Sequence, residues 1–332
     1  VLTSAYADVS TAISSDDAFE ISGEVNDLAY PNDNSEATKL IIKDGTVINT
    51  LDFKLGKAGT KLDVYVEGSL VIKGSIQILG DVTIEGNEDG TSKIVDSSSN
   101  TSAYSLIDFN KNKKAHLTLK KIELSNLENR NNVDKEEYII CVSGFPTYLD
   151  IEDVKFESLN ASKAIIGIGL YPPKNVFGFT TANIKNSKII DNTSEENIIS
   201  ISGGITNIEN TTIINNNCKK NTLSISPDNK KYDHSISLSN ITLKNNIESC
   251  SLYMNKGNNI ILNNKNFDIF LNDGNVIESD KIAVTFSNSF LIDKWKLIKG
   301  NNNITGKVKF EQEPEKDYYY VTKDGVCYLS SY

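Results

Sequence analysis

The sequence contains very little arginine or histidine. Among its 332 residues, Arg130 is the only arginine, and His116 and His234 are the only histidines. Bidentate clamps on carboxylates or phosphates depend on arginine, so this chain can build one at most. Lys and Arg number 34 against 44 Asp and Glu, which gives a net charge of -10. This acidic balance argues against binding to nucleic acid or to an anionic membrane surface.

Cysteine and long apolar stretches are also scarce. The four cysteines form no C-x-x-C pair, which excludes the common zinc and redox motifs. The longest apolar run, Ala164 to Leu170, is far shorter than the ~20 residues of a membrane-spanning helix, so we expect no membrane insertion. The tripeptide Ala5-Tyr6-Ala7 has the form of a signal-peptide cleavage site, which is one interpretation of this start.

Short apolar segments with a two-residue period repeat along the chain. A central apolar residue, called the anchor here, recurs every 24 to 33 residues, which is the spacing of solenoid coils. A second short segment with the same strand period precedes each anchor, and helical spacing is missing. The anchors are Leu119, Ile151, Ile184, Ile208 and Leu238.

This repeat predicts an all-β fold in which the chain winds as a parallel β-helix. We expect an N-terminal cap and first coil over residues 1–60, with a short helix at Val9 to Ile13. The parallel β-helix then covers residues 61–275, and residues 276–332 form either further coils or a small β capping module. A cap is expected because an open solenoid end exposes unpaired strand edges.

Stacked coils place equivalent side chains in columns, and two columns are predicted. One would alternate in charge on the outer surface. The other would form a ladder of hydrogen-bonded amides, which gives a role to the 40 asparagines. The charged column is Lys120, Glu152, Lys185, Glu209 and Ser239, and the amide column is Asn126, Ser158, Asp191, Asn215 and Asn245.

Tetrapeptides in these repeats are similar to those of a known group. Ile189-Ile-Asp-Asn192 and Ile213-Ile-Asn-Asn216 match a Phe-x-x-Asn repeat with aliphatic residues in place of Phe, and Gly203-Gly204-Ile205 matches a Gly-Gly-Ala-Ile repeat. The chain thus resembles right-handed parallel β-helix surface proteins of the pectate-lyase-like superfamily, including the polymorphic outer membrane proteins. The resemblance, with the crossover rule, implies a right-handed coil. The regular coil, the acidic composition and the lack of a catalytic set favour a secreted or cell-surface, adhesin-like or structural protein without catalytic activity.

The alternative is a polysaccharide lyase or glycoside hydrolase with paired carboxylates in a lateral groove. The N-T-D, G-H-G and R-I-K blocks of pectin-hydrolysing relatives are missing, and no calcium-loop pattern occurs. We therefore assign no catalytic residue, no metal site and no cofactor, and we expect both histidines to be surface residues in loops. The carboxylates that stacked coils would bring to such a groove are Asp108, Asp150, Glu152, Asp153 and Glu209.

Two further sites are expected. The loop between Gly169 and Phe179 carries Tyr171, Phe177 and Phe179, which suit stacking on a sugar or contact with a protein. Its partner would be an extracellular glycan or a surface protein of a host or neighbouring cell; the competing interpretation is that Phe177 and Phe179 pack the loop down.

The second site is a pair of cysteines. Cys218 lies ten residues after its anchor Ile208, and Cys250 lies twelve after Leu238. This spacing places both near one corner of neighbouring coils and predicts a disulfide or a close contact.

Overall fold

The computed structural model describes most of the chain. The described residues are 18–26, 38–97, 105–109, 114–126, 136–144, 146–170, 179–227, 232–255, 265–287, 297–299, 301–310, 318–323 and 326–331. The helix expected at Val9 to Ile13 lies outside them.

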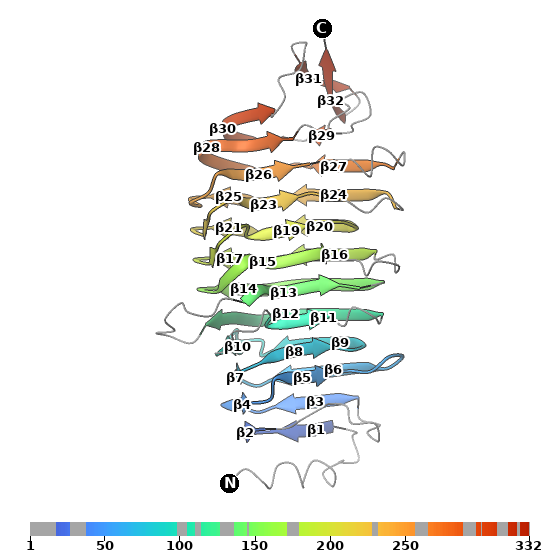
Figure 1. Ribbon diagram of the computed structural model, residues 1–332, viewed down its shortest axis with the longest axis vertical. Helices are drawn as coiled ribbons and strands as arrows, with labels where there is room; N and C mark the ends of the chain where they lie inside the picture. Colours follow the sequence, from blue (N-terminus) through green and yellow to red (C-terminus); the bar gives the residue numbers. More distant parts are fainter. Residues whose placement is uncertain are drawn as a thin grey trace.

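The described chain forms a parallel β-helix, as predicted. A 30-stranded sheet holds all strands except a terminal pair, and each strand in it pairs in parallel with the equivalent strand of the next coil. Figure 1 shows these strands as successive rungs along the long axis, from β1 near one end to β30 near the other. The last two strands, β31 (Tyr318–Lys323) and β32 (Val326–Ser331), form an antiparallel hairpin.

The strands fall into three ladders that follow the three sides of the coil. The first ladder contains β1 (Ala18–Ile21), β3 (Lys39–Ile42), β6 (Lys61–Val66), β9 (Asp81–Gly86), β12 (Ala115–Asn126), β14 (Thr147–Glu157), β16 (Thr180–Lys185), β20 (Ile205–Glu209), β24 (His234–Ser239), β27 (Phe267–Leu271) and β29 (Leu297–Lys299).

The second ladder continues beyond a corner, and the ends of β12 and β14 belong to it. Its other members are β2 (Glu24–Val25), β4 (Thr46–Ile48), β7 (Ser69–Ile72), β10 (Lys93–Asp96), β17 (Lys188–Ile190), β21 (Thr212–Ile214), β25 (Thr242–Lys244) and the starts of β28 (Val276–Phe286) and β30 (Asn303–Phe310).

The third ladder corresponds to the strand expected before each anchor. It contains β5 (Asp52–Leu55), β8 (Ser75–Ile78), β11 (Ile107–Phe109), β13 (Glu136–Ser143), β15 (Asn160–Leu170), β19 (Ile199–Ile201), β23 (Asn221–Ile225), β26 (Cys250–Met254) and the ends of β28 and β30, with the short β18 (Thr193–Ser194) and β22 (Asn217–Cys218) alongside.

The winding extends past both expected domain boundaries. Parallel pairing begins at Ala18, so residues 1–60 contain two levels of coil. Pairing of β3 with β6 crosses residue 60, and pairing of β25 with β28 crosses residue 275. The described coil is therefore continuous from β1 to β30.

The register confirms the predicted anchors. Ile151 pairs with Leu119 and Ile184, and Ile208 pairs with Ile184 and Leu238. All five side chains are buried in one continuous core, where each adds ~1.5–3 kcal/mol of apolar burial. The predicted charged column is also in register, since the same pairings align Lys120, Glu152, Lys185, Glu209 and Ser239.

The predicted amide column has a different role. Ser158, Asp191, Asn215 and Asn245 are exposed and have φ between 54° and 57°, so they form a corner of the coil rather than a ladder. Asn and Asp tolerate this left-handed conformation better than other residues with a Cβ. A second corner, with φ between 49° and 55°, consists of Lys121, Asp153, Asn186, Asn210 and Asn240.

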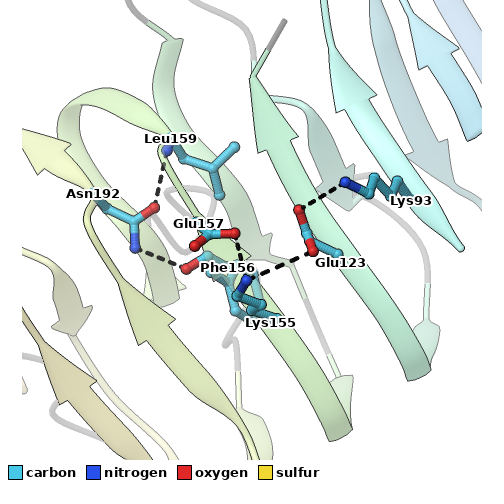
Figure 2. A network of polar contacts seen from close by, with 7 residues as sticks. All are labelled: Lys93, Glu123, Lys155, Phe156, Glu157, Leu159 and Asn192. Atoms are coloured by element: carbon cyan, nitrogen blue, oxygen red, sulfur yellow. Dashed lines mark hydrogen bonds and ion pairs between the residues drawn. The ribbon is translucent and has the colours of Figure 1, made fainter. Parts of the chain in front are cut away.

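A buried amide ladder lies one residue after the first of these corners. Both the backbone N–H and the side-chain amide of Asn192 donate to Oδ1 of Asn216, at 3.0 Å each. Asn216 donates in the same way to Asn246, at 2.9 and 3.1 Å. Figure 2 shows Asn192 receiving the N–H of Leu159 and donating to the carbonyl of Phe156. These amides satisfy buried backbone groups where the strands end.

We predict that Asn216→Ala destabilises the protein by about 2–4 kcal/mol, because it leaves the buried N–H of Asn192 and the carbonyl of Ile189 without their partner. Urea unfolding at neutral pH measures this free energy. Asn217→Ala, at the exposed neighbouring position, is the control and should cost about 0.5 kcal/mol or less. Equal losses in the two variants would contradict the role of the ladder.

Candidate functional site

An open hollow of about 750 Å³ lies where strands of the first ladder begin. It is lined by residues 58–61, 80–81 and 114–116 and by Tyr148, which come from four successive coils. Its size is that of a small-molecule or oligosaccharide site.

The register explains why such different side chains meet in this hollow. Lys61 pairs with Asp81, Asp81 with His116, and His116 with Tyr148. Side chains of successive coils are about 4.8 Å apart, and these four occupy the same outward position of the pleat. A cation, a carboxylate, an imidazole and a phenol therefore form one column, called the His116 column here.

The imidazole of His116 lies between two carboxylates. Its Nε2 is 2.6 Å from Oδ2 of Asp150, and its Nδ1 is 3.7 Å from Oδ1 of Asp81. Oδ1 of Asp150 accepts a hydrogen bond from Asn183 at 2.8 Å, and Asn183 accepts one from Asn207 at 3.0 Å. A connected polar chain thus extends from the hollow along the solenoid axis.

The charges of this pair reinforce each other. The hydrogen bond to Asp150 raises the pKa of His116, and the same bond lowers the pKa of Asp150. The ring is therefore an imidazolium paired with a carboxylate over a wider pH range than a free histidine. The His116 side chain is 35% exposed and that of Asp150 38%, so solvent screens the pair and a ligand can reach it.

Both histidines differ from their predicted places in loops. His116 is the second residue of β12, and its ring is tilted by 54° against Tyr148 at 5.7 Å between centroids. His234 is the first residue of β24 and is 3% exposed, with Nδ1 accepting the N–H of Gly204 at 2.7 Å. Counting back three residues from the anchor Leu119 would have placed His116 in the strand.

The proposed carboxylates do not converge on one groove. Asp108 lies in the third ladder, Asp153 at a corner, and Glu152 and Glu209 in the charged column. Of these candidates, Asp150 is the one that contacts His116. Its counterpart Asp81 was missed, because it belongs to a coil before the clearest repeats.

The predicted binding loop is described only at its end. Tyr171 and Phe177 lie outside the described residues. The ring of Phe179 packs edge-on against Tyr232 at 5.4 Å, and its carbonyl accepts the N–H of Thr147 at 3.2 Å. The loop therefore ends beside the coil that carries Tyr148, and sugar stacking on its aromatic rings stays a prediction.

A second hollow, of about 200 Å³, lies around the corner and is lined by Lys121, Glu123 and Lys155 among others. Figure 2 shows that Glu123 and Lys155 are each paired with charges of the opposite sign. Glu123 lies 3.6 Å from Lys93 and 3.8 Å from Lys155, and Lys155 lies 2.5 Å from Glu157. Charged side chains that already pair with each other have fewer groups left to bind a ligand, so the larger hollow is the better candidate.

The predicted Cys218–Cys250 disulfide is wrong, since both are buried free thiols. A parallel backbone β-bridge between Asn217 and Ile247 places Cys218 in register with Glu248 of the next coil. Cys250 instead pairs with Asn221. The number of residues between each cysteine and its anchor does not reveal this difference in register.

The neighbour of Cys218 is thus a buried acid. Thr222 and Ser251 donate hydrogen bonds to the Glu248 carboxylate, which is 5% exposed. Burial raises the pKa of Glu248, and burial with the nearby Glu248 charge raises the pKa of Cys218 to about 12.

Within the described residues, no three or more His, Cys, Asp or Glu side chains group as metal ligands. The same part of the chain contains no helix that is long and apolar enough to span a membrane. No family model matches the sequence, and no curated protein matches it either. The resemblance to β-helix surface proteins therefore stays a prediction, and the site is interpreted from its geometry alone.

We predict that Glu248→Gln makes stability less dependent on pH. Because the pKa of Glu248 is higher in the folded than in the unfolded state, the wild type loses stability as pH rises through the folded-state pKa. The free energy of unfolding of the variant should therefore exceed that of the wild type by about 1–3 kcal/mol near pH 8 and equal it near pH 4. Urea unfolding across this range measures the difference. Glu209→Gln removes an exposed carboxylate and should leave the profile unchanged.

We also predict that Cys141, Cys218 and Cys250 react slowly with a thiol reagent in the native protein and rapidly in urea without reductant, because they are buried free thiols. Mass spectrometry of the labelled peptides identifies each site. Failure of Cys218 and Cys250 to label in urea until a reductant is added would reinstate the disulfide.

Proposed function

We propose that this protein is a secreted or cell-surface β-helix protein that binds a glycan, without catalysis, in the hollow beside His116. The observation that carries the proposal is the His116 column, in which Lys61, Asp81 and Tyr148 face one open hollow with the imidazole. Sugars present hydroxyls that both donate and accept hydrogen bonds, and the carboxylate, ammonium and imidazole groups and the aromatic ring that line the hollow complement them.

The polar groups are held in place before any ligand arrives. Asp150 is fixed by His116 on one oxygen and by Asn183 on the other. All three side chains project from strands that pair on both sides, so little conformational freedom is lost on binding. A rigid array of this kind favours a ligand whose shape already fits the site, because the side chains do not rearrange around it.

The protonation states favour binding over glycoside hydrolysis. A hydrolase needs one carboxylic acid that stays protonated near neutral pH, which requires a raised pKa. The pKa of Asp150 is lowered by its hydrogen bond to His116. In the same pair the hydrogen bond to Asp150 raises the pKa of His116, which favours the imidazolium over the neutral ring that a general base requires.

The second candidate is a polysaccharide-active enzyme. The observation in its favour is that His116, with a carboxylate beside each ring nitrogen, faces an open hollow. A ligand that displaces Asp150 from Nε2 would free the imidazole to transfer a proton.

We expect the wild-type protein to bind members of an array of immobilised neutral and acidic oligosaccharides, and His116→Ala to bind them at least about tenfold more weakly. Asp268→Asn is the matched control, because Asp268 occupies the same outward position at the far end of the ladder. Circular dichroism checks that each variant is folded.

The outcomes separate the candidates. Absence of glycan binding by the wild type, or equal binding by His116→Ala, contradicts the proposal. Release of reducing ends or unsaturated uronates from a polysaccharide panel would support the enzyme instead. Binding to cell-surface protein that persists after the glycans are removed enzymatically would identify a protein partner.

A further inference from the structure

We propose that the hollow is a proton-gated site, which holds its ligand while the His116 imidazolium links Asp81 to Asp150 and releases it when the ring loses its proton. This inference rests on the proposed glycan binding and adds its regulation. It concerns three strands at once, because Asp81 lies on β9, His116 on β12 and Asp150 on β14.

The placement of the two carboxylates favours a ring that carries two N–H groups. Nε2 lies at hydrogen-bond distance from Asp150, and Nδ1 faces Asp81 at 3.7 Å. A neutral imidazole has one N–H and one lone pair, so it would turn a lone pair toward one of the carboxylates. The imidazolium is the form that faces both carboxylates favourably, and it ties three coils together.

The surrounding charges set the range of the gate. Asp81 and Asp150 favour the imidazolium, and Lys61 of β6 opposes it. Lys114, just before β12, and Tyr148 of β14 also line the hollow. The hydrogen bond to Asp150 is the largest of these influences, and the net effect is a raised pKa of His116. The ligand is therefore held below the pKa of His116 and released above it, and this change lies at higher pH than for an unperturbed histidine.

Loss of the proton changes the hollow in two ways. Asp150 keeps the N–H on Nε2, but Asp81 then faces a lone pair, and the hollow has one positive charge fewer. The ring is no longer held from both sides, so the ligand loses oriented partners. By linkage, a ligand that binds the protonated site better must also raise the pKa of His116 by the same factor.

His234 can serve as an internal reference in an NMR titration of His116, since these two are the only histidines of the protein. His234 is buried in β24, where Nδ1 accepts the N–H of Gly204, away from both carboxylates. The two Cε1–H signals can be assigned with His116→Gln, and the His234 signal reports whether each variant is folded.

The first experiment follows the His116 Cε1–H signal by NMR between about pH 5 and pH 10 in wild type, Asp81→Asn and Asp150→Asn. We expect the wild-type midpoint to be the highest, and the midpoint of Asp150→Asn to be the lowest because the closer carboxylate is neutralised. Equal midpoints in the three proteins would overturn the gate without any reference to a ligand.

The second experiment reads the same oligosaccharide array near pH 6 and near pH 9. Wild type and Asp268→Asn should bind about tenfold more weakly at the higher pH, whereas the residual binding of His116→Gln should be the same at both. Wild-type binding that does not change with pH overturns the gate and leaves glycan binding intact. Absence of binding at either pH overturns the proposed function, and the gate with it.

Discussion

Parallel hydrogen bonding between successive coils is the constraint on which the rest of this structure depends. It places each residue of a ladder over its equivalent in the coil before, at about 4.8 Å. The inward column of anchors, Leu119 through Leu238, is buried as one core for this reason. The outward columns follow from the same spacing, so the core and the candidate site are both consequences of one register.

The corners of the coil need additional hydrogen-bond partners, because the strands end there and their backbone groups would otherwise be left unpaired. Two devices solve the problem. Residues such as Asn210 and Asn215 adopt a left-handed conformation that turns the chain, and the buried amides of Asn192 and Asn216 replace the lost backbone hydrogen bonds. The abundance of asparagine therefore has two structural causes, of which the stacking of amides is only one.

The candidate site arises because the outward columns combine different chemistries. The charged column alternates in sign and neutralises itself, and the small hollow at the corner behaves similarly. At the His116 column, by contrast, the imidazole lies between Asp81 of the column and Asp150 of the following coil, with Tyr148 next to it and open space in front. That combination favours a recognition site over a purely structural role.

The sequence alone specifies the winding, because the alternation of apolar residues and the recurrence of the anchors are local properties that burial turns directly into strands and a core. It also determined the acidic surface and the register around Ile151. Which polar side chains meet depends on how the coils stack in three dimensions. Coil lengths vary, so the alignment of Asp81 with His116, and of Cys218 with Glu248 instead of Cys250, depends on how each corner takes up its extra residues. Those offsets are set by packing between coils, and spacing along the chain does not contain them.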